Sequence, residues 1–275
     1  MQRLVLVYKT SRVSYIRFGT GPKLVFCFHG YGEDGTSFSF FEKYAGLQYS
    51  FFAMDLPFHG QTEWADGLSC TSSDLVMMIE KILQENSLRP AVGNIHFSLV
   101  GYSLGGRMAL SIYEKIPSRI EKIILLAPDG LKVNFWYWLS TQTRIGTKLF
   151  SFTMKHPAWF FGLLKWLNKL KLVNASIFKF VNYYIGDETI RQLLYKRWTS
   201  LRKLKPDLNI IKSSVRDNKT PVRLIYGKHD RIILPARGEK FINGMEENGV
   251  LMIIPSGHQV LHEKHAQEIL QALLH

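Results

Sequence analysis

Gly101-Tyr102-Ser103-Leu104-Gly105-Gly106 is the stretch that decides the fold of this 275-residue chain. It follows an apolar run at residues 95–100 and precedes an amphipathic segment, residues 104–116, that stops at Pro117. A G-x-S-x-G sequence between a strand and a helix puts its serine in a strained turn at the helix N-terminus. Small residues are needed around that turn, because a Cβ atom there would collide with the strand and the helix. We therefore predict that Ser103 is a nucleophile.

Short apolar runs alternate with amphipathic segments on both sides of this turn. Continuous apolar runs indicate strands buried on both faces, which occur in parallel sheets covered by helices. Residues 4–8 and 13–18 predict an N-terminal hairpin. The fold class is therefore α/β, with a mostly parallel central sheet flanked by helices. Further strands are predicted at residues 24–28, 51–54, 95–100, 123–127, 222–226 and 250–254, and helices at residues 73–85, 104–116, 236–247 and 262–274.

Residues 131–212 interrupt the alternation. They contain no strand-like run but several helical ones, which predicts an all-helical insertion between two parts of a sheet domain, residues 1–130 and 213–275. The insertion carries fifteen Lys and Arg against three acidic residues, a net charge of +12, whereas the rest carries twenty against nineteen, a net charge of +1. It also holds five of the six tryptophans. Nearly all of the basic excess of the chain therefore lies in an aromatic-rich segment.

This composition leaves several interpretations of the insertion open. An aromatic underside would give a dry, apolar pocket for an acyl chain or a ring. A basic outer face could attract anionic substrates or lie on anionic lipid, so a membrane surface is a candidate partner. The plainer alternative is a solvated basic face whose aromatic residues pack onto the sheet domain. Nucleic acid is not expected as a partner, because no recognised binding motif accompanies the charge.

A serine hydroxyl needs a base, and the base needs an orienting carboxylate, because the free hydroxyl is a weak nucleophile at neutral pH. Asp230 follows the predicted strand at residues 222–226, and His258 follows the one at residues 250–254. Catalytic groups gather past the carboxyl ends of strands in open parallel sheets. The sequence therefore predicts Ser103 as nucleophile, His258 as base and Asp230 as the acid that orients the base.

An oxyanion hole would complete such a site, and it requires backbone N–H groups aimed at the developing negative charge. His29-Gly30-Tyr31-Gly32 ends the predicted strand at residues 24–28, and Leu104 directly follows the predicted nucleophile. In this architecture one donor comes from each of these places. We predict the N–H groups of Tyr31 and Leu104 as the donors.

Taken together, the motifs resemble those of the α/β-hydrolase superfamily. The resemblance covers nearly all of the chain outside the insertion, and it implies a serine hydrolase with a helical cap inserted after the sixth strand. Phe58 stands where relatives commonly have glycine, and a bulkier residue there could narrow the pocket entrance. Ser103 argues against the members with an aspartate nucleophile. The resemblance rests on residues 28–32, 55–62, 101–106, 227–230 and 257–258.

A narrower resemblance concerns residues 101–110, which are similar to the elbow of menaquinone-pathway succinyl-hydroxycyclohexadiene-carboxylate synthases. In those enzymes an arginine four residues after the serine helps to hold an anionic substrate. Arg107 has that position, one turn from Ser103 on the predicted helix. Arg107 and His29 are therefore candidate substrate-binding residues. The alternative is that Arg107 pairs with a neighbouring carboxylate.

The remaining signals are mostly exclusions. Cys27 and Cys70 cannot form a disulfide scaffold and have no partners at metal-ligand spacing, so we expect no metal and a cytoplasmic location. No apolar run approaches the roughly 20 residues of a membrane span. No cofactor is expected, because no cofactor motif appears, and the glycine turn lacks the Lys-Ser/Thr pair of a phosphate loop. The oligomeric state is left open.

Three functions fit this sequence. The first is a serine hydrolase that cleaves an ester or related acyl bond of a small to medium substrate. The second is a lyase or carbon–carbon hydrolase that acts on an anionic substrate held by Arg107. The third is a receptor that keeps the fold without catalysis.

Overall fold

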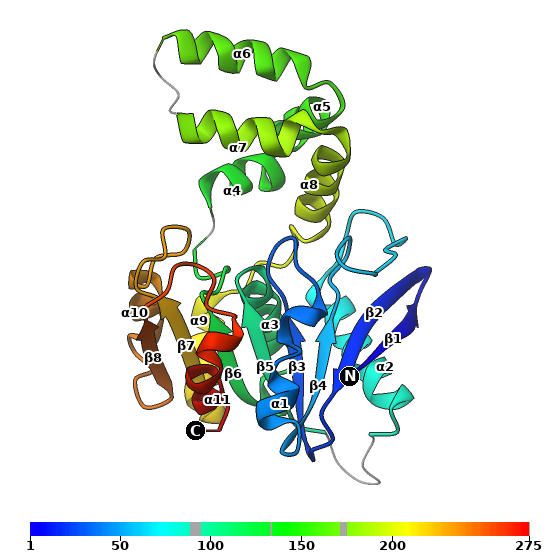
Figure 1. Cartoon of the computed structure of the whole chain (residues 1–275), viewed down its shortest axis with the longest axis vertical. Coiled ribbons are helices and arrows are strands. Elements are labelled where there is room, and N and C mark those ends of the chain that lie inside the picture. The colour runs from blue at the N-terminus through cyan, green and yellow to red at the C-terminus, as the bar shows by residue number, and fades with distance from the viewer. Residues whose placement is uncertain (89–94, 133, 171–174, 275) are drawn as a thin grey trace. The chain divides into compact units, whose positions relative to one another are not determined.

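A computed structural model describes residues 1–88, 95–132, 134–170 and 175–274. Its eight strands form one sheet in the order β1-β2-β4-β3-β5-β6-β7-β8. Strand β2 is antiparallel to β1 and β4, and the other neighbouring strands are parallel (Figure 1). The strands are β1 (Gln2–Tyr8), β2 (Ser11–Phe18), β3 (Lys23–Phe28), β4 (Tyr49–Met54), β5 (Phe97–Tyr102), β6 (Ile120–Leu126), β7 (Val222–Gly227) and β8 (Gly249–Ile254).

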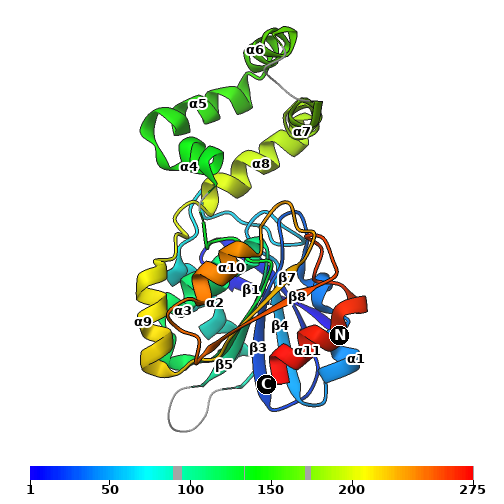
Figure 2. The same ribbon diagram turned by 90° about the vertical axis from the view of Figure 1, so that its left-hand side faces the viewer.

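Helices cover both faces of this sheet, which confirms the predicted α/β class. On one face lie α2, α3 and α9, and on the other lie α1 and α11 (Figure 2). With α10, which packs on β8, the helices are α1 (Phe41–Ala45), α2 (Ser72–Glu85), α3 (Leu104–Lys115), α9 (Leu208–Asn218), α10 (Ala236–Ile242) and α11 (Ala266–Leu274). Short 3₁₀ turns occur at Gly35–Phe38, Pro117–Arg119 and Glu263–His265.

The central strands are buried because their sequences are apolar throughout. Every residue of β4 and β5 is buried, as is all of β3 after Lys23. Phe26 of β3 lies between two further rings, with centroids 5.2 Å from Phe52 and 5.0 Å from Phe97. Such aromatic pairs stabilise a sheet beyond the area that they bury. The core thus lies directly beneath the strand ends that carry the predicted site residues.

Helix boundaries follow local capping chemistry. Thr71 caps α2 through a capping box with Asp74, in which each side chain accepts from the other residue's backbone N–H. The helix predicted at residues 236–247 is too long, since α10 ends at Ile242. Asn243, with a ψ of 121°, leaves the helical conformation, and Gly244 then has a φ of 87°, a left-handed conformation that glycine adopts without strain.

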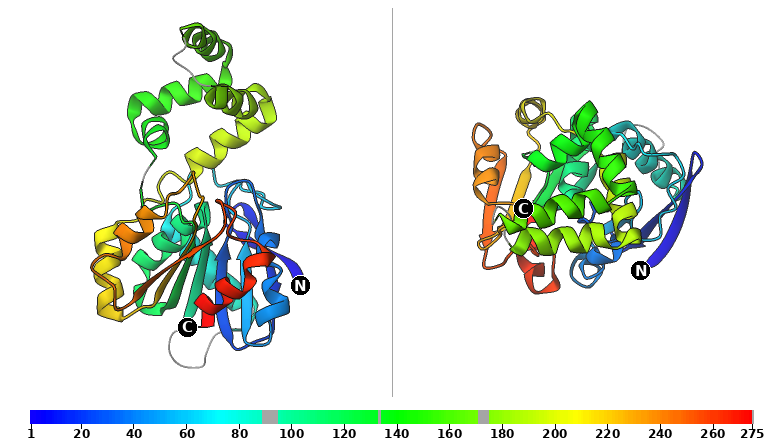
Figure 3. Two further views of the ribbon diagram at one scale, coloured as in Figure 1. Left: turned by 60° about the vertical axis from the view of Figure 1, so that its left-hand side comes forward. Right: turned by 90° about the horizontal axis from the view of Figure 1, so that it is seen from above.

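The helical segment after β6 forms a second compact unit. The chain divides into a first unit, residues 1–66, 70–132 and 203–275, and a second unit, residues 67–69 and 133–202. Within the second unit α4 packs on α5 and α8, and α8 also packs on α5 and α7 (Figure 3). Its helices are α4 (Phe135–Gln142), α5 (Arg144–Lys155), α6 (Ala158–Lys169), α7 (Ala175–Gly186) and α8 (Glu188–Ser200).

The chain returns to the sheet unit before the predicted end of the insertion. Residues 203–212 belong to the first unit, because α9 begins at Leu208 and packs on α3. The backbone N–H of Asp207 donates to the Glu114 carboxylate of α3 at 3.0 Å. In the part of the chain that the structure describes, no helix combines the length and the apolar character that crossing a membrane requires.

Candidate active site

Ser103 lies in the turn between β5 and α3, with a φ of 48° and a ψ of −113°. A positive φ is costly for a residue with a Cβ, so the surroundings must hold this conformation. The glycines around it make room. A Cβ at Gly101 would lie 2.5 Å from the carbonyl oxygen of Gly105, and one at Gly105 would lie 1.8 Å from that of Phe28. Strand and helix can therefore meet at this turn only through glycine.

Hydrogen bonds from outside the turn hold the main chain of Ser103 in place. Its N–H donates to the carbonyl of Leu126 at 2.9 Å, and its carbonyl accepts from the N–H of Asp129 at 2.8 Å. The turn is therefore held by the end of β6 and the segment that follows it.

The structure brings Ser103, His258 and Asp230 together. His258 Nε2 lies 2.9 Å from Ser103 Oγ, and His258 Nδ1 lies 2.8 Å from Asp230 Oδ2. The Asp230 side chain is fully buried, and its Oδ1 accepts from the N–H groups of Ile232 and Ile233 at 2.8 and 2.9 Å. These contacts fix the carboxylate, which in turn fixes the ring of the histidine.

Three further residues connect the loops of this site. Tyr102 donates through its hydroxyl to Gln259 Oε1 at 3.0 Å, and burial raises the pKa of that hydroxyl, which keeps its proton in place. Gln259 donates to Glu33 Oε1 at 3.2 Å, and Glu33 Oε2 accepts from the N–H of Gly30 at 3.4 Å. This relay joins the loops after β3, β5 and β8. The relay was not predicted, because nothing local in the sequence marks side-chain pairs so far apart.

The predicted oxyanion donors come from two neighbouring strand ends. In the parallel pair of β3 and β5, Phe28 lies opposite Gly101, so the loop at residues 29–32 emerges beside the serine turn. Leu104 is the first residue of α3, and an N–H at that position has no partner within its helix. The ring of Tyr31 packs edge-on against that of His59 at 5.8 Å.

His29 does not face a substrate, contrary to the expectation from the sequence. Its side chain is fully buried, and its Nδ1 lies 2.8 Å from the carbonyl oxygen of Gly30. Its Nε2 accepts from the N–H of Leu56 at 3.1 Å. One nitrogen thus donates and the other accepts, and burial lowers the pKa of the ring, so both observations favour the neutral form. His29 therefore ties the loop after β3 to the loop after β4.

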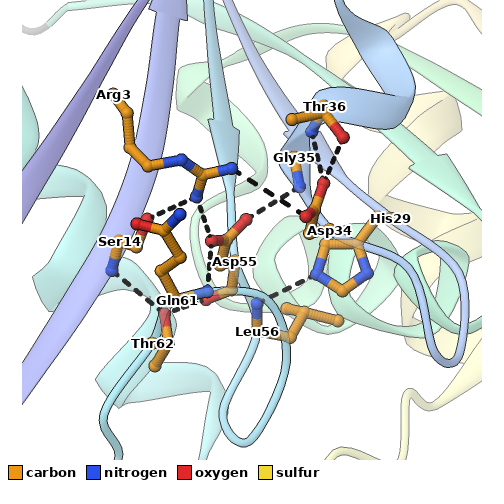
Figure 4. Close-up of polar contacts among 10 residues, drawn as sticks. All are labelled: Arg3, Ser14, His29, Asp34, Gly35, Thr36, Asp55, Leu56, Gln61 and Thr62. Atoms are coloured by element: carbon orange, nitrogen blue, oxygen red, sulfur yellow. Dashed lines mark hydrogen bonds and ion pairs between the residues drawn. The ribbon is translucent and has the colours of Figure 1, made fainter.

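Asp55 is the centre of a polar network beneath the loop after β3 (Figure 4). Its fully buried carboxylate accepts from the N–H of Gly35 at 2.8 Å and from that of Gln61 at 2.9 Å, and it pairs with Arg3 at 2.5 Å. Arg3 also donates to Ser14 Oγ at 2.7 Å. The network joins β1 and β2 to the loops after β3 and β4. The resemblance had marked Asp55 through its motif, but Arg3 carried no signal.

Arg107 forms an ion pair with Asp129, which is the carboxylate alternative considered for it above. Its side chain is about one-tenth exposed. Because Asp129 also donates its N–H to the carbonyl of Ser103, the pair steadies the serine turn. The geometry gives no support to a direct contact between Arg107 and an anionic substrate.

The two cysteines are separate from the hydrogen bonds described above. Cys27 and Cys70 are buried free thiols, and burial raises the pKa of both. Among the residues that the structure describes, no group of three or more His, Cys, Asp or Glu side chains could hold a metal ion.

Comparison with known proteins agrees with this fold. The chain is 25% identical to the uncharacterised hydrolase YugF of Bacillus subtilis over 252 residues, 89% of this chain and 86% of that one. It is 24% identical to a 2-hydroxy-6-oxononadienedioate/2-hydroxy-6-oxononatrienedioate hydrolase of Burkholderia vietnamiensis, over 96% and 90% of the two chains. The structure of a thermophilic esterase from Thermogutta terrifontis superposes with a TM-score of 0.68 at 17% identity, covering 100% and 98% of the chains.

A protein family also matches most of the chain. The family described as serine aminopeptidase S33 matches residues 21–265, which include the serine turn, both loops after β7 and β8, and the whole helical segment. The chain belongs to this family of hydrolases, within the α/β-hydrolase superfamily.

Proposed function

We propose that this protein is a serine hydrolase that cleaves an ester or related acyl bond of a small to medium substrate through an acyl-enzyme. The observation that carries the proposal is the unbroken pair of hydrogen bonds from Ser103 through His258 to Asp230. An alcohol becomes a competent nucleophile only when a base in hydrogen-bond reach takes its proton. The 2.9 Å contact between Ser103 Oγ and His258 Nε2 meets that condition.

The buried carboxylate of Asp230 sets the tautomer of the base. Because it accepts from Nδ1–H of His258, the lone pair of Nε2 faces the serine hydroxyl. Ser103 Oγ attacks the carbonyl carbon while Nε2 takes the proton, and the imidazolium then returns this proton to the leaving group. A water molecule repeats the two steps on the acyl-enzyme, which releases the acid and restores the serine.

The amides of Tyr31 and Leu104 stabilise the tetrahedral intermediates in this scheme. Two backbone donors at the ends of adjacent strands can face one oxygen without any side-chain movement. The relay through Glu33 and Gln259 supports this role, because it connects the loop of Tyr31 to the loop of His258. Loss of one such donor typically lowers turnover by about 10²–10³-fold.

The test is labelling with a fluorophosphonate probe, followed by kinetics on p-nitrophenyl esters of increasing chain length. Wild-type protein should be labelled and should hydrolyse short esters. Ser103→Ala should not be labelled, and its turnover should be lower by about 10³-fold or more. Ser118→Ala, at an exposed serine of the same protein, is the matched control and should retain both. An unchanged rate in Ser103→Ala would refute the assignment. Absence of labelling in the wild type would favour a non-catalytic receptor.

A second function is favoured by the names of several relatives. The hydrolase of Burkholderia vietnamiensis is named for an oxo-dienedioate, a substrate name that contains no ester or amide, so hydrolysis of such a compound divides a carbon–carbon bond. The same serine, base and acid would serve that reaction on an anionic substrate. Turnover of an oxo-dienedioate above that of neutral esters would support it. Arg107→Ala would then distinguish two roles of this residue. A rise in KM would indicate that Arg107 binds the substrate, whereas a fall in kcat would indicate that its pair with Asp129 positions the serine turn.

A further inference from the structure

Large apolar side chains are exposed in an ordered row on α5 and α6. Three of them occur at i, i+4 and i+7 on α5, and four repeat this spacing along α6 to its C-cap. Each is between 37% and 81% exposed. The rings of Phe152 and Trp159 lie 6.4 Å apart, so the two rows meet where the helices join. We call this set the apolar stripe: Ile145, Leu149, Phe152, Trp159, Leu163, Trp166 and Leu170.

Basic side chains flank the stripe on both helices. With about 3.6 residues per turn, the cations of α5 fall on one side of its row, and the buried residues Thr153 and Met154 fall toward the other. Helix α6 repeats this order, with buried Leu164 on the side away from its cations. The flanking residues are all exposed: Arg144, Lys148, Lys155, Lys165 and Lys169.

The surrounding sequence has charge of one sign only. Residues 130–186 contain eight Lys or Arg and no Asp or Glu. Exposing several large apolar side chains in one row to water is unfavourable. Exposed patches of this kind mark interaction sites. A partner for this face must accept apolar and aromatic side chains and supply negative charge beside them. The interface of an anionic lipid bilayer offers both.

We propose that the apolar stripe and its flanking cations bind the surface of an anionic membrane. Helices α5 and α6 lie in the interface, with Trp159 and Trp166 at the level of the headgroups. Lys148, Lys165 and Lys169 face the lipid phosphates. Each such cation strengthens binding by roughly fivefold, so the three together contribute about 100-fold. The contact is peripheral and salt-dependent.

Cosedimentation of the full-length chain with lipid vesicles tests the proposal. Vesicles of phosphatidylcholine with 30% phosphatidylglycerol should bind the protein at 0.1 M salt, and vesicles of phosphatidylcholine alone should bind it at least about 100-fold more weakly, because they offer no negative charge to these three lysines. Lys148→Gln/Lys165→Gln/Lys169→Gln should weaken binding about 100-fold. The matched control neutralises three exposed lysines of the sheet unit and should change binding by less than threefold: Lys115→Gln, Lys240→Gln and Lys264→Gln.

A second variant tests the contribution of the apolar stripe. Trp159→Gln/Trp166→Gln should weaken binding at least tenfold with an unchanged Tm. Leu47→Gln/Val250→Gln, at two exposed apolar residues of the sheet unit, is the control and should bind like the wild type. Brominated lipids should quench the tryptophan fluorescence of the bound wild type. The conservative variant Trp159→Phe/Trp166→Phe should still bind but show much less quenching.

Three results would overturn the proposal. The first is no binding to anionic vesicles. The second is binding that the stripe variants leave unchanged or that occurs without tryptophan quenching. The third is a combination of two observations: the Trp-to-Gln variant has a much lower Tm, and lipid quenches the wild type and the Trp-to-Phe variant equally. The apolar stripe would then pack within the chain and would not contact lipid. Binding requires no turnover, so these results are independent of the proposed hydrolysis.

Discussion

Replacing Asp55 by asparagine would remove a buried negative charge from the network beneath the loop of Tyr31. The asparagine oxygen can still accept from the N–H of Gly35, but its NH₂ group would face two donors, Arg3 and the N–H of Gln61. Two charge-assisted hydrogen bonds are lost, at roughly 1.5–3 kcal/mol each. Arg3 is about one-quarter exposed and regains some hydration. We therefore expect a loss of about 3–4 kcal/mol in the free energy of unfolding.

The same substitution should slow ester hydrolysis without removing it. Asp55 holds Gly35 and not Tyr31 itself, so the predicted oxyanion donor shifts rather than disappears. We expect kcat to fall about tenfold with little change in KM. This fall is smaller than the one expected when an oxyanion donor is removed altogether. Guanidinium unfolding measures the first effect, and steady-state kinetics on a short p-nitrophenyl ester measures the second.

A double-mutant cycle with Arg3→Met isolates the ion pair. The coupling energy between the two substitutions should be about 2 kcal/mol, because each partner is costly to leave alone in a buried site. Asp217→Asn, at an exposed carboxylate of α9, is the control and should change stability by less than about 0.5 kcal/mol. A loss below about 1 kcal/mol in Asp55→Asn, or a coupling energy near zero, would refute this reasoning.

Three further substitutions probe the remaining features of the site. Asp230→Asn should lower kcat by roughly 10³–10⁴-fold because His258 loses its orienting acceptor, and a fall smaller than tenfold on the ester panel would contradict the proposed role. Gly105→Ala should destabilise the fold by about 3 kcal/mol or more, because its Cβ would meet the carbonyl of Phe28, whereas Gly257→Ala, with open space around its Cβ, should stay within about 0.5 kcal/mol in the same unfolding assay. The lowered pKa of His29 means that the unfolded chain binds this proton more readily, so stability should fall as the pH drops below about 6.5, and His29→Gln should flatten that dependence in unfolding curves from pH 7 to 5.

The sheet could be predicted from the sequence because its signals are local. Each central strand is a continuous apolar run, and the glycines around Ser103 mark the turn that follows β5. Asp230 and His258 could be selected because catalytic groups gather past the carboxyl ends of strands, which restricts the candidates. The structure then brings their side chains within hydrogen-bond distance.

The supporting contacts could not be predicted, because they join residues far apart in the chain. Gln259 meets Glu33 across 226 positions, and Arg3 meets Asp55 across 52, with no pattern that pairs them. His29 was misassigned for a related reason. A histidine at a strand end has the same sequence signature whether it faces a ligand or bonds to a neighbouring loop. Burial, which the local sequence does not give, distinguishes the two.

Both connections to the helical segment are attached to one helix of the sheet unit. Asp129, just before the segment, pairs with Arg107 of α3, and Asp207, just after it, bonds to Glu114 of the same helix. A single rigid element therefore anchors the ends of everything inserted between them. This makes the segment an exchangeable module: substitution of residues 131–202 by another helical insert preserves the serine turn as long as these two anchors are kept. The sequence of the module can then vary while the main-chain geometry of the turn stays constant.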